Sequence, residues 1–272
     1  MQVYDGLRIL TARPSDADLA RAPHRLYGHV PPAAEYSVGA WARDAAPLLA
    51  ELAAEGRMPI ICGGTGLYFK ALLGGLDVMP EIPEAVRAGW RERMAEEGPQ
   101  ALHAELARRD PETAARLRPG DPQRITRALE ILETTGVPLS ALQRGTAAPL
   151  LDAGEALKIL LAPPRPQLRD NIRIRFDQML EEGALAEAKA FADIPGAPAG
   201  TAGKAIGVAE LGEHLAGRLT LDAAAALAVT RSRQYAKRQE TWFRHQFDSS
   251  WLQPTEQLAP FADKLIDRVK SR

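Results

Sequence analysis

A threonine in a glycine-rich turn is the first group along the chain that could do chemistry. Thr65 lies between Gly64 and Gly66, shortly after the apolar run 58–62. Glycine lets the backbone turn sharply and lets a ligand approach closely. A hydroxyl and free amides at a helix start face the cleft beyond the strand ends, where open α/β sheets bind their ligands. A plain turn with Thr65 as the helix cap fits the same residues, and spacing alone favours it.

Residues 121–130 predict a helix whose polar face suits RNA. Asp121 can cap this helix and Pro122 fits its first turn. Apolar side chains at helical spacing form the expected buried stripe of Ile125, Ala128, Leu129 and Leu132. The opposite side carries an amide that can read a base edge and two guanidinium groups that can hold phosphates, namely Gln123, Arg124 and Arg127. The pattern alone favours a simpler alternative, a solvated face with a salt bridge to Glu130.

A basic segment at 231–244 predicts an anion-binding helix. It holds five basic residues and one acidic residue in a chain whose net charge is only −1. Phosphate, diphosphate and an RNA backbone all suit such a surface, although a nonspecific basic cluster has the same pattern. Tyr235 and Trp242 fall at helical spacing, so we expect both rings to pack on the core rather than to stack on bases. Arg173 and Arg175 form a weaker basic helix of the same kind.

The elements that must position these groups alternate between helix and strand. Helices are expected at 38–55, 65–73, 167–191 (broken near Gly183) and 221–247, and buried strands at 58–62, 157–162 and 250–252. Residues 81–147 are nearly all helical in pattern. The sequence therefore predicts an α/β protein with a parallel-sheet core at 1–80 and 148–272, interrupted by a helical insertion at 81–147.

Composition excludes several classes of protein. One cysteine rules out an internal disulfide, and five scattered histidines offer no metal site in this chain. No basic segment followed by an apolar run opens the chain, and no apolar run approaches about 18 residues, so neither a signal peptide nor a membrane span is expected. We expect a cytoplasmic monomer.

The phosphate-cradle pattern Gly-x4-Gly-Lys-Ser/Thr does not occur in the 272 residues. The segment around Gly203 and Lys204 approaches it, but Pro198 stands where the first glycine would be and Ala205 stands where the hydroxyl would be. A phosphate loop is therefore not predicted there.

Together these segments resemble the tRNA dimethylallyltransferase (tRNA isopentenyltransferase) family. The resemblance runs in order from Met1 to about Leu252 and rests on long motifs: MQVY…TARP at the start, GGTGLY at 63–68, DPQRITRALE at 121–130, RFDQM at 175–179 and RQYAKRQETWFR at 233–244. It implies a P-loop nucleotide-kinase-like parallel-sheet core, here N-terminally truncated, with a helical insertion that contacts tRNA.

The implied reaction moves a dimethylallyl group from dimethylallyl diphosphate to N6 of the adenosine adjacent to the tRNA anticodon. The family flips this adenosine into a channel, and Mg2+ assists loss of diphosphate. The partners implied are therefore the tRNA anticodon stem-loop and dimethylallyl diphosphate.

Matching positions imply roles for individual residues. Thr65 would line the channel. The implied tRNA contacts are Gln2, Arg87, Gln123, Arg124 and Arg127. The implied diphosphate contacts are Arg175, Arg233, Lys237 and Arg238.

The family's phosphate loop and general-base aspartate have no counterpart in the chain, so we expect these 272 residues to be inactive by themselves. An internal start codon or a shortened chain is the simplest explanation. One alternative function is a noncatalytic tRNA-binding protein. Another is a P-loop kinase of a small metabolite, which would need neither the 121–130 face nor the basic C-terminal helix.

Overall fold

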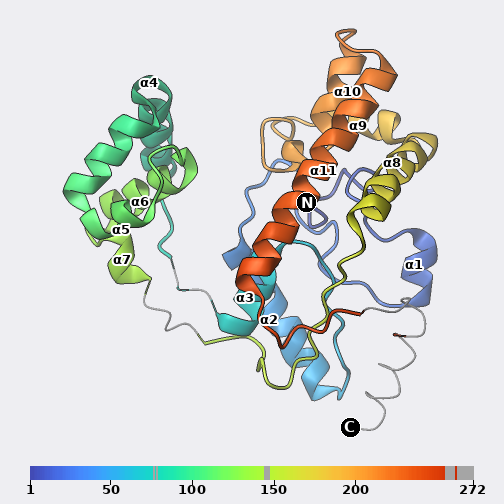
Figure 1. Ribbon diagram of the computed structural model, residues 1–272, viewed down its shortest axis with the longest axis horizontal. Coiled ribbons are helices and arrows are strands. Elements are labelled where there is room, and N and C mark those ends of the chain that lie inside the picture. Colours follow the sequence, from blue (N-terminus) through green and yellow to red (C-terminus); the bar gives the residue numbers. More distant parts are fainter. Residues whose placement is uncertain (76, 78, 144–147, 255–260, 262–272) are drawn as a thin grey trace. The chain divides into compact units, whose positions relative to one another are not determined.

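The computed structural model describes residues 1–75, 77, 79–143, 148–254 and 261. The chain forms two compact units: Met1–Phe69 together with Gly154–Arg272, and Lys70–Ala153 (Figure 1). No helix in the described residues is long and apolar enough to cross a membrane.

Helices dominate the first unit. They are α1 (Asp16–Arg21), α2 (Val38–Ala54), α8 (Arg165–Glu181), α9 (Ala184–Ala192), the 3-10 turn η1 (Ala202–Lys204), α10 (Val208–Leu215) and α11 (Leu221–Gln246), with α3 (Gly66–Gly74) beginning in this unit and ending in the other. These bounds confirm the helices predicted at 38–55, 65–73 and 221–247, and the break near Gly183. Side-chain oxygens of Ser15, Ser37 and Thr220 cap α1, α2 and α11, as their positions before each helix favour.

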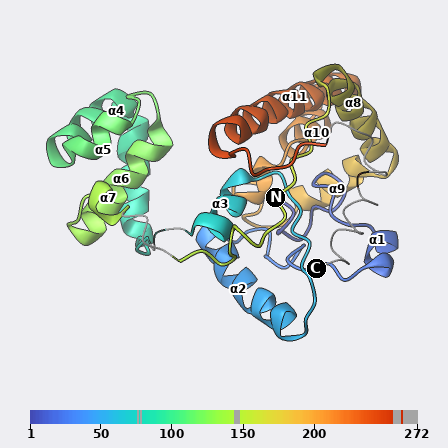
Figure 2. The ribbon, with the colours of Figure 1, turned by 60° about the horizontal axis from the view of Figure 1, so that its bottom comes forward.

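The long helix α11 packs against α10 and α8 (Figure 1, Figure 2). Its N-terminal half buries Ala224, Ala228 and Val229, whose small side chains let neighbouring helices approach. Phe191 of α9 and Leu211 of α10 are also fully buried, and α10 packs against both α9 and α11.

The prediction of a buried strand at 58–62 is wrong. These residues have no strand assignment, and the side chains of Met58 and Ile60 are 64% and 86% exposed. A parallel strand is buried only when neighbouring strands and covering helices enclose it, and no backbone pairing of 58–62 is recorded among the described residues.

Strand-like pairing is limited to two isolated parallel bridges in the described part of the chain. Tyr4 pairs with Val30, and Ile159 pairs with Leu252. The second bridge joins two of the segments predicted as strands, 157–162 and 250–252. The parallel sheet expected from the sequence is not formed as a ladder here, so that detail of the predicted α/β core stays unconfirmed.

The second unit is a small helical body with its own core. It contains most of α3 and the helices α4 (Glu84–Arg109), α5 (Pro111–Arg116), α6 (Pro122–Thr135) and α7 (Leu139–Leu142). The four residues predicted as the buried stripe of α6, Ile125, Ala128, Leu129 and Leu132, are all buried. Its core also includes Trp90, Leu102 and Leu106 of α4. Asp121 caps α6 by accepting from the amide of Arg124 at 3.2 Å, as predicted.

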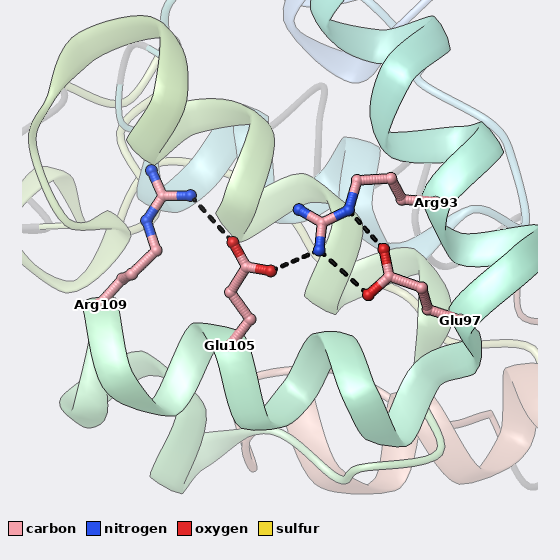
Figure 3. Close-up of polar contacts among 4 residues, drawn as sticks. All are labelled: Arg93, Glu97, Glu105 and Arg109. Atoms are coloured by element: carbon pink, nitrogen blue, oxygen red, sulfur yellow. Dashed lines mark hydrogen bonds and ion pairs between the residues drawn. The ribbon is translucent and has the colours of Figure 1, made fainter.

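Helix α4 bends at Gly98, which has φ +79° and precedes Pro99. One ion pair, between Arg93 and Glu105, joins its two halves across this bend (Figure 3). Arg93, before the bend, pairs with Glu97 at 2.5 Å and with Glu105, beyond the bend, at 2.6 Å; Arg109 pairs with the other oxygen of Glu105 at 3.4 Å. Glycine permits the turn, and the shared carboxylate links the two helical segments.

Candidate substrate-binding site

The glycine-rich loop is held directly against α11. Gln239 donates from Nε2 to the carbonyl oxygen of Gly64 at 2.7 Å. A side chain at Gly64 would place its Cβ 2.2 Å from Gln239 Nε2, and one at Gly66 would place it 2.0 Å from the ring of Trp242. Gly66 is therefore required by close packing against the Trp242 ring, whereas a side chain at Gly64 would displace the flexible end of Gln239. Trp242 packs inward as the sequence predicted.

Thr65 lies exposed on this loop, immediately before α3 begins at Gly66. Its carbonyl oxygen accepts from the amide of Tyr68 at 2.9 Å. The ring of Tyr68 stacks on Trp41 of α2 at 4.5 Å, which anchors the start of α3. Cys62, just ahead of the loop, is also exposed. The exposed hydroxyl of Thr65 is therefore accessible to a ligand.

Two of the basic residues of α11 are committed to carboxylates. Arg231 lies 2.7 Å from Glu210 Oε1, and the side chain of Glu210 is only 1% exposed. Glu210 Oε2 accepts from the amide of Gly207 at 2.8 Å. Arg244 pairs with Glu240 at 3.1 Å, where Arg165 also binds at 2.9 Å. The Arg165 guanidinium, with Arg244 beside it, holds the pKa of Glu240 below its ordinary value.

The other three basic residues are exposed cations. In the described part of the chain, no carboxylate is recorded against Arg233, Lys237 or Arg238. Arg233 donates to the carbonyl oxygen of Arg169 at 3.4 Å, and the guanidinium of Arg238 lies 5.7 Å from the ring centre of Tyr235. Cations without an internal counter-charge favour an anionic ligand at this surface.

The prediction that Tyr235 packs on the core is wrong. Its side chain is 41% exposed. The stripe of α11 that faces inward is covered at Ala228 and again at Trp242, which the glycine loop contacts. Tyr235 lies between these two contacts, and neither of them covers its ring. Helical spacing alone could not show this gap.

Arg175 lines a separate pocket of about 510 Å3 between α8 and the loop 8–18. Two further guanidinium groups, from Arg8 and Arg13, line the same pocket. Arg13 donates to the carbonyl oxygen of Tyr4 at 3.0 Å and pairs with Asp5 at 3.2 Å. The amide of Gly6, followed by Arg13, lowers the pKa of Asp5. The described contacts do not join Arg175 to Thr65 or to the exposed cations of α11.

Gln2 lies at the edge of the same loop. Its Nε2 donates to the carbonyl oxygen of Ala12 at 2.7 Å, which fixes one end of the side-chain amide. Its oxygen is the acceptor end of that amide.

The helical unit presents the other predicted RNA contacts. Gln123 and Arg124 are exposed, and the Arg124 side chain, 73% exposed, lies 3.5 Å from Asp121. Arg127 lies 3.5 Å from Glu130, the salt bridge that the alternative interpretation of this face expects. Arg87 borders a hollow of about 450 Å3 together with residues 81–84. This geometry accommodates both a solvated face and an RNA-binding face.

Sequence reasoning missed Gln239, Arg8 and Arg13. Gln239 lies inside the basic motif 233–244, but only the fold shows that it bonds to the glycine loop. Arg8 and Arg13 lie in the opening segment. The sequence signal for them was two basic residues shortly after Gly6. No cluster of three or more His, Cys, Asp or Glu side chains that could hold a metal ion occurs among the described residues.

The glycine loop is seated on a basic helix, and a separate pocket is lined by three arginines together with Asp18 and Glu182. Exposed guanidinium and ammonium groups of this kind suit phosphorylated or polyanionic ligands. A family model described as "IPP transferase" matches residues 2–246. The chain belongs to this family of prenyl-transferring enzymes.

Similar proteins have consistent names. The chain is 51% identical to a tRNA dimethylallyltransferase of Agrobacterium fabrum over 93% of this chain and 86% of the relative, and 52% identical to one of Chelativorans over 92% and 86%. A solved tRNA isopentenylpyrophosphate transferase of Bacillus halodurans aligns with TM-score 0.66 at 32% identity, covering 99% of this chain and 84% of that one. A eukaryotic dimethylallyltransferase crystallised acting on tRNA aligns with TM-score 0.71 at 25% identity, covering 89% and 61%.

Proposed function

We propose that this protein is a tRNA dimethylallyltransferase, which transfers a dimethylallyl group from dimethylallyl diphosphate to N6 of the adenosine adjacent to the tRNA anticodon. The observation that carries the proposal is about 50% identity, over more than nine-tenths of the chain, to relatives of that name. The family match disfavours a kinase of a small metabolite, since it covers the helical unit and the basic helix as well as the core.

The chemistry requires a held leaving group and an oriented nucleophile. The N6 nitrogen attacks C1 of the dimethylallyl group, the C1–oxygen bond breaks, diphosphate departs with the electron pair, and N6 loses a proton. Departing diphosphate needs cations, which Arg175, Arg233, Lys237 and Arg238 would supply. A weakly nucleophilic amine needs orientation, which we assign to Gln2 and to the channel residue Thr65.

Mg2+ belongs to the proposed reaction as a companion of the diphosphate. Magnesium commonly takes its ligands from substrate phosphates, water and one or two carboxylates. The described residues hold no cluster of three or more His, Cys, Asp or Glu side chains, so the diphosphate and water would supply most of the ligands of the ion.

The helical unit is the proposed tRNA-contacting part. Gln123, Arg124 and Arg127 lie on one side of α6, and Arg87 lies near the start of α4. We propose a separate helical insertion at 81–147, and the compact unit Lys70–Ala153, which spans this range, supports it. We further propose that the protein acts as a monomer in the cytoplasm, where its tRNA substrate would be met.

Binding and transfer test the proposal separately. We expect the protein to bind an unmodified anticodon stem-loop with adenosine at the target position more tightly than a matched stem-loop with guanosine there. Equal binding of both RNAs at low and high salt would contradict the proposed substrate.

Transfer is measured by mass spectrometry of the tRNA after incubation with dimethylallyl diphosphate and Mg2+. Because the 272 residues lack the phosphate-cradle pattern, we expect little turnover. Loss of a general base alone typically lowers the reaction rate by about 10²- to 10⁴-fold. Normal turnover would overturn the expected inactivity and locate the catalytic groups within this chain. Binding with no turnover at any protein concentration would match the noncatalytic alternative.

A further inference from the structure

A single carboxylate organises the loop that carries Arg8 and Arg13. Glu187, on α9, accepts hydrogen bonds from three consecutive backbone amides. Its Oε1 accepts from Arg8 at 2.6 Å and from Ile9 at 2.8 Å, and its Oε2 accepts from Leu10 at 2.8 Å. Consecutive amides that converge on one anion form a backbone nest, and bonds to an ionised acceptor are stronger than neutral ones.

The same loop is closed by internal bonds beyond the nest. The amide of Ala12 donates to Ile9 O and that of Arg13 to Arg8 O, both at 2.9 Å. The hydroxyl of Thr11 donates to the carbonyl oxygen of Leu7. Ala12 has φ +51°, a left-handed conformation that is costly for any residue with a Cβ. The surrounding bonds therefore hold Ala12 in a conformation that it would not adopt alone.

Ala12 is the residue that fixes Gln2. Its carbonyl oxygen accepts from Gln2 Nε2 at 2.7 Å. The bond from one N–H of the NH2 group fixes the orientation of the amide, so its oxygen has a set direction as a hydrogen-bond acceptor, and the second N–H remains a donor. Adenine presents an N6 amino donor on its pairing edge, whereas guanine presents an O6 acceptor at the equivalent position. The oxygen of a Gln2 amide fixed in this orientation can accept from N6 of adenine, whereas O6 of guanine would place two acceptors against each other.

We propose that Glu187 is a positioning residue for base recognition. Glu187 binds the amides of residues 8–10 and so fixes the conformation of the loop. That conformation fixes the position of the Ala12 carbonyl oxygen. The hydrogen bond from Gln2 to this oxygen then determines which end of the Gln2 amide faces the base. This inference rests on the proposed function, because it concerns how the target adenosine is chosen. It assigns to α9 a part in substrate selection without direct contact with RNA.

A carboxylate is specifically needed at position 187. Both of its oxygens only accept hydrogen bonds, which matches amides that only donate. In Glu187→Gln, one oxygen is replaced by an NH2 group that faces a backbone N–H, so at least one amide of the nest loses its partner. The size of the side chain stays the same, so the substitution tests hydrogen bonding rather than packing.

The experiment compares the affinities of two anticodon stem-loops, with adenosine or guanosine at the target position, for five proteins: wild type, Gln2→Ala, Glu187→Gln, the double variant and Glu181→Gln. Glu181→Gln is the matched control, because it removes the same charge at an exposed site at the end of α8. We expect wild type and the control to prefer adenosine by about tenfold. Gln2→Ala and Glu187→Gln should each lose most of this preference while binding the guanosine stem-loop like wild type.

The double variant should lose no more preference than either single variant, since both act through one contact. A Glu187→Gln protein that keeps the wild-type preference while Gln2→Ala loses it would overturn the inference. If wild type itself shows no preference, the proposed substrate fails instead.

A folding defect would appear as lost binding to both stem-loops. In that event Thr11→Val decides, because it replaces the hydroxyl that closes the same loop with a methyl group of similar size and so removes one hydrogen bond. Reduced preference for adenosine in Thr11→Val supports the positioning role of the loop, and unchanged preference overturns it.

Discussion

At the scale of single residues, the site is distinguished by what Gly64 and Gly66 lack. Their missing side chains allow Gln239 and Trp242 to touch the loop backbone. Gly63, one residue earlier, has open space where a Cβ would be. Adjacent glycines of one motif therefore meet different constraints, which the motif itself does not reveal.

Gly66→Ala should destabilise the protein, because its Cβ would overlap the Trp242 ring and the ring is held in aromatic contacts with Phe243 and Phe247. Overpacking of this kind typically costs about 1–3 kcal/mol. Thermal unfolding of Gly66→Ala, with Gly63→Ala as the matched control, measures the effect. Equal melting temperatures for the two variants would show that the Trp242 ring moves aside at little cost and that its contact with position 66 is not close-packed.

Arg124→Ala should weaken binding to the anticodon stem-loop by about 1–3 kcal/mol if the arginine reads a base edge. A phosphate contact should instead reduce the slope of log affinity against log salt by about one. The melting temperature should hardly change, because the side chain is 73% exposed. Arg127→Ala should behave in the same way, with a smaller contribution if its salt bridge to Glu130 dominates.

Two controls frame this measurement. Arg116→Ala removes an exposed guanidinium from α5 of the same unit and should leave specific RNA binding unchanged. Ile125→Ala should cost about 2–5 kcal/mol of stability, because Ile125 is fully buried on the opposite side of α6. If both arginine variants bind like wild type at two salt concentrations, the α6 face is only solvated.

At the scale of elements, the bend in α4 depends on charge. Arg93 lowers the pKa of both Glu97 and Glu105, so these carboxylates are stabilised in their ionised form (Figure 3). A lowered pKa contributes stability above the ordinary glutamate pKa of about 4.3, and the contribution is lost as the pH falls through the folded-state value. The linkage across Gly98 should therefore weaken in acid.

Glu105→Gln should lower the melting temperature at about pH 7, because it removes the carboxylate that joins the two halves of α4. As the pH falls through the folded-state pKa of Glu105, which Arg93 holds below the ordinary value, the wild-type carboxyl becomes protonated, so the difference between the variant and wild type should shrink in acid. Glu112→Gln, which breaks an exposed pair on α5, should differ little from wild type at either pH. A Glu105→Gln deficit that persists unchanged in acid would show that packing, not charge, holds the bend.

Helices could be predicted from this sequence more fully than strands. Helical spacing over many residues identified α2, α6 and α11, and the buried stripe of α6 agrees residue by residue. The apolar run at 58–62 has no such internal check, because burial of a strand depends on neighbours elsewhere in the chain. The same dependence explains Tyr235, whose spacing fits a buried stripe that no other described segment covers at that turn.

The site could be predicted only by its residue types. The motifs named Thr65, Arg175 and the basic residues of α11. Thr65, Arg175, Arg233, Lys237 and Arg238 are exposed, and their ligand contacts stay predictions. The basic residues of α11 fall into two groups that the sequence could not separate. Arg231 and Arg244 pair with carboxylates. No carboxylate partner is described for Arg233, Lys237 and Arg238. The contact of Glu187 with residues 8–10 joins segments far apart in the chain and has no local signal.

At the scale of the whole molecule, the two compact units have separate cores. The cluster formed by Trp90, Leu102, Leu106, Ile125 and Leu129 lies entirely within Lys70–Ala153. We predict that a fragment of residues 70–153 folds on its own, since a unit with a complete apolar core needs no other part of the chain to bury it. Circular dichroism should show a helical spectrum and one cooperative thermal transition.

Leu129→Ala in the same fragment provides the control, because loss of a fully buried leucine should lower the melting temperature clearly. A fragment with a broad, non-cooperative transition that Leu129→Ala does not shift would mean that the helical unit needs the remainder of the protein.

The single cysteine gives this molecule a practical property. Cys62 is exposed and stands immediately before the glycine loop that carries Thr65. Because the sequence contains no second thiol, a maleimide dye would attach at one place without any prior mutagenesis. Its emission would report on the environment of the loop, so ligand titrations could be followed optically in the otherwise unaltered protein.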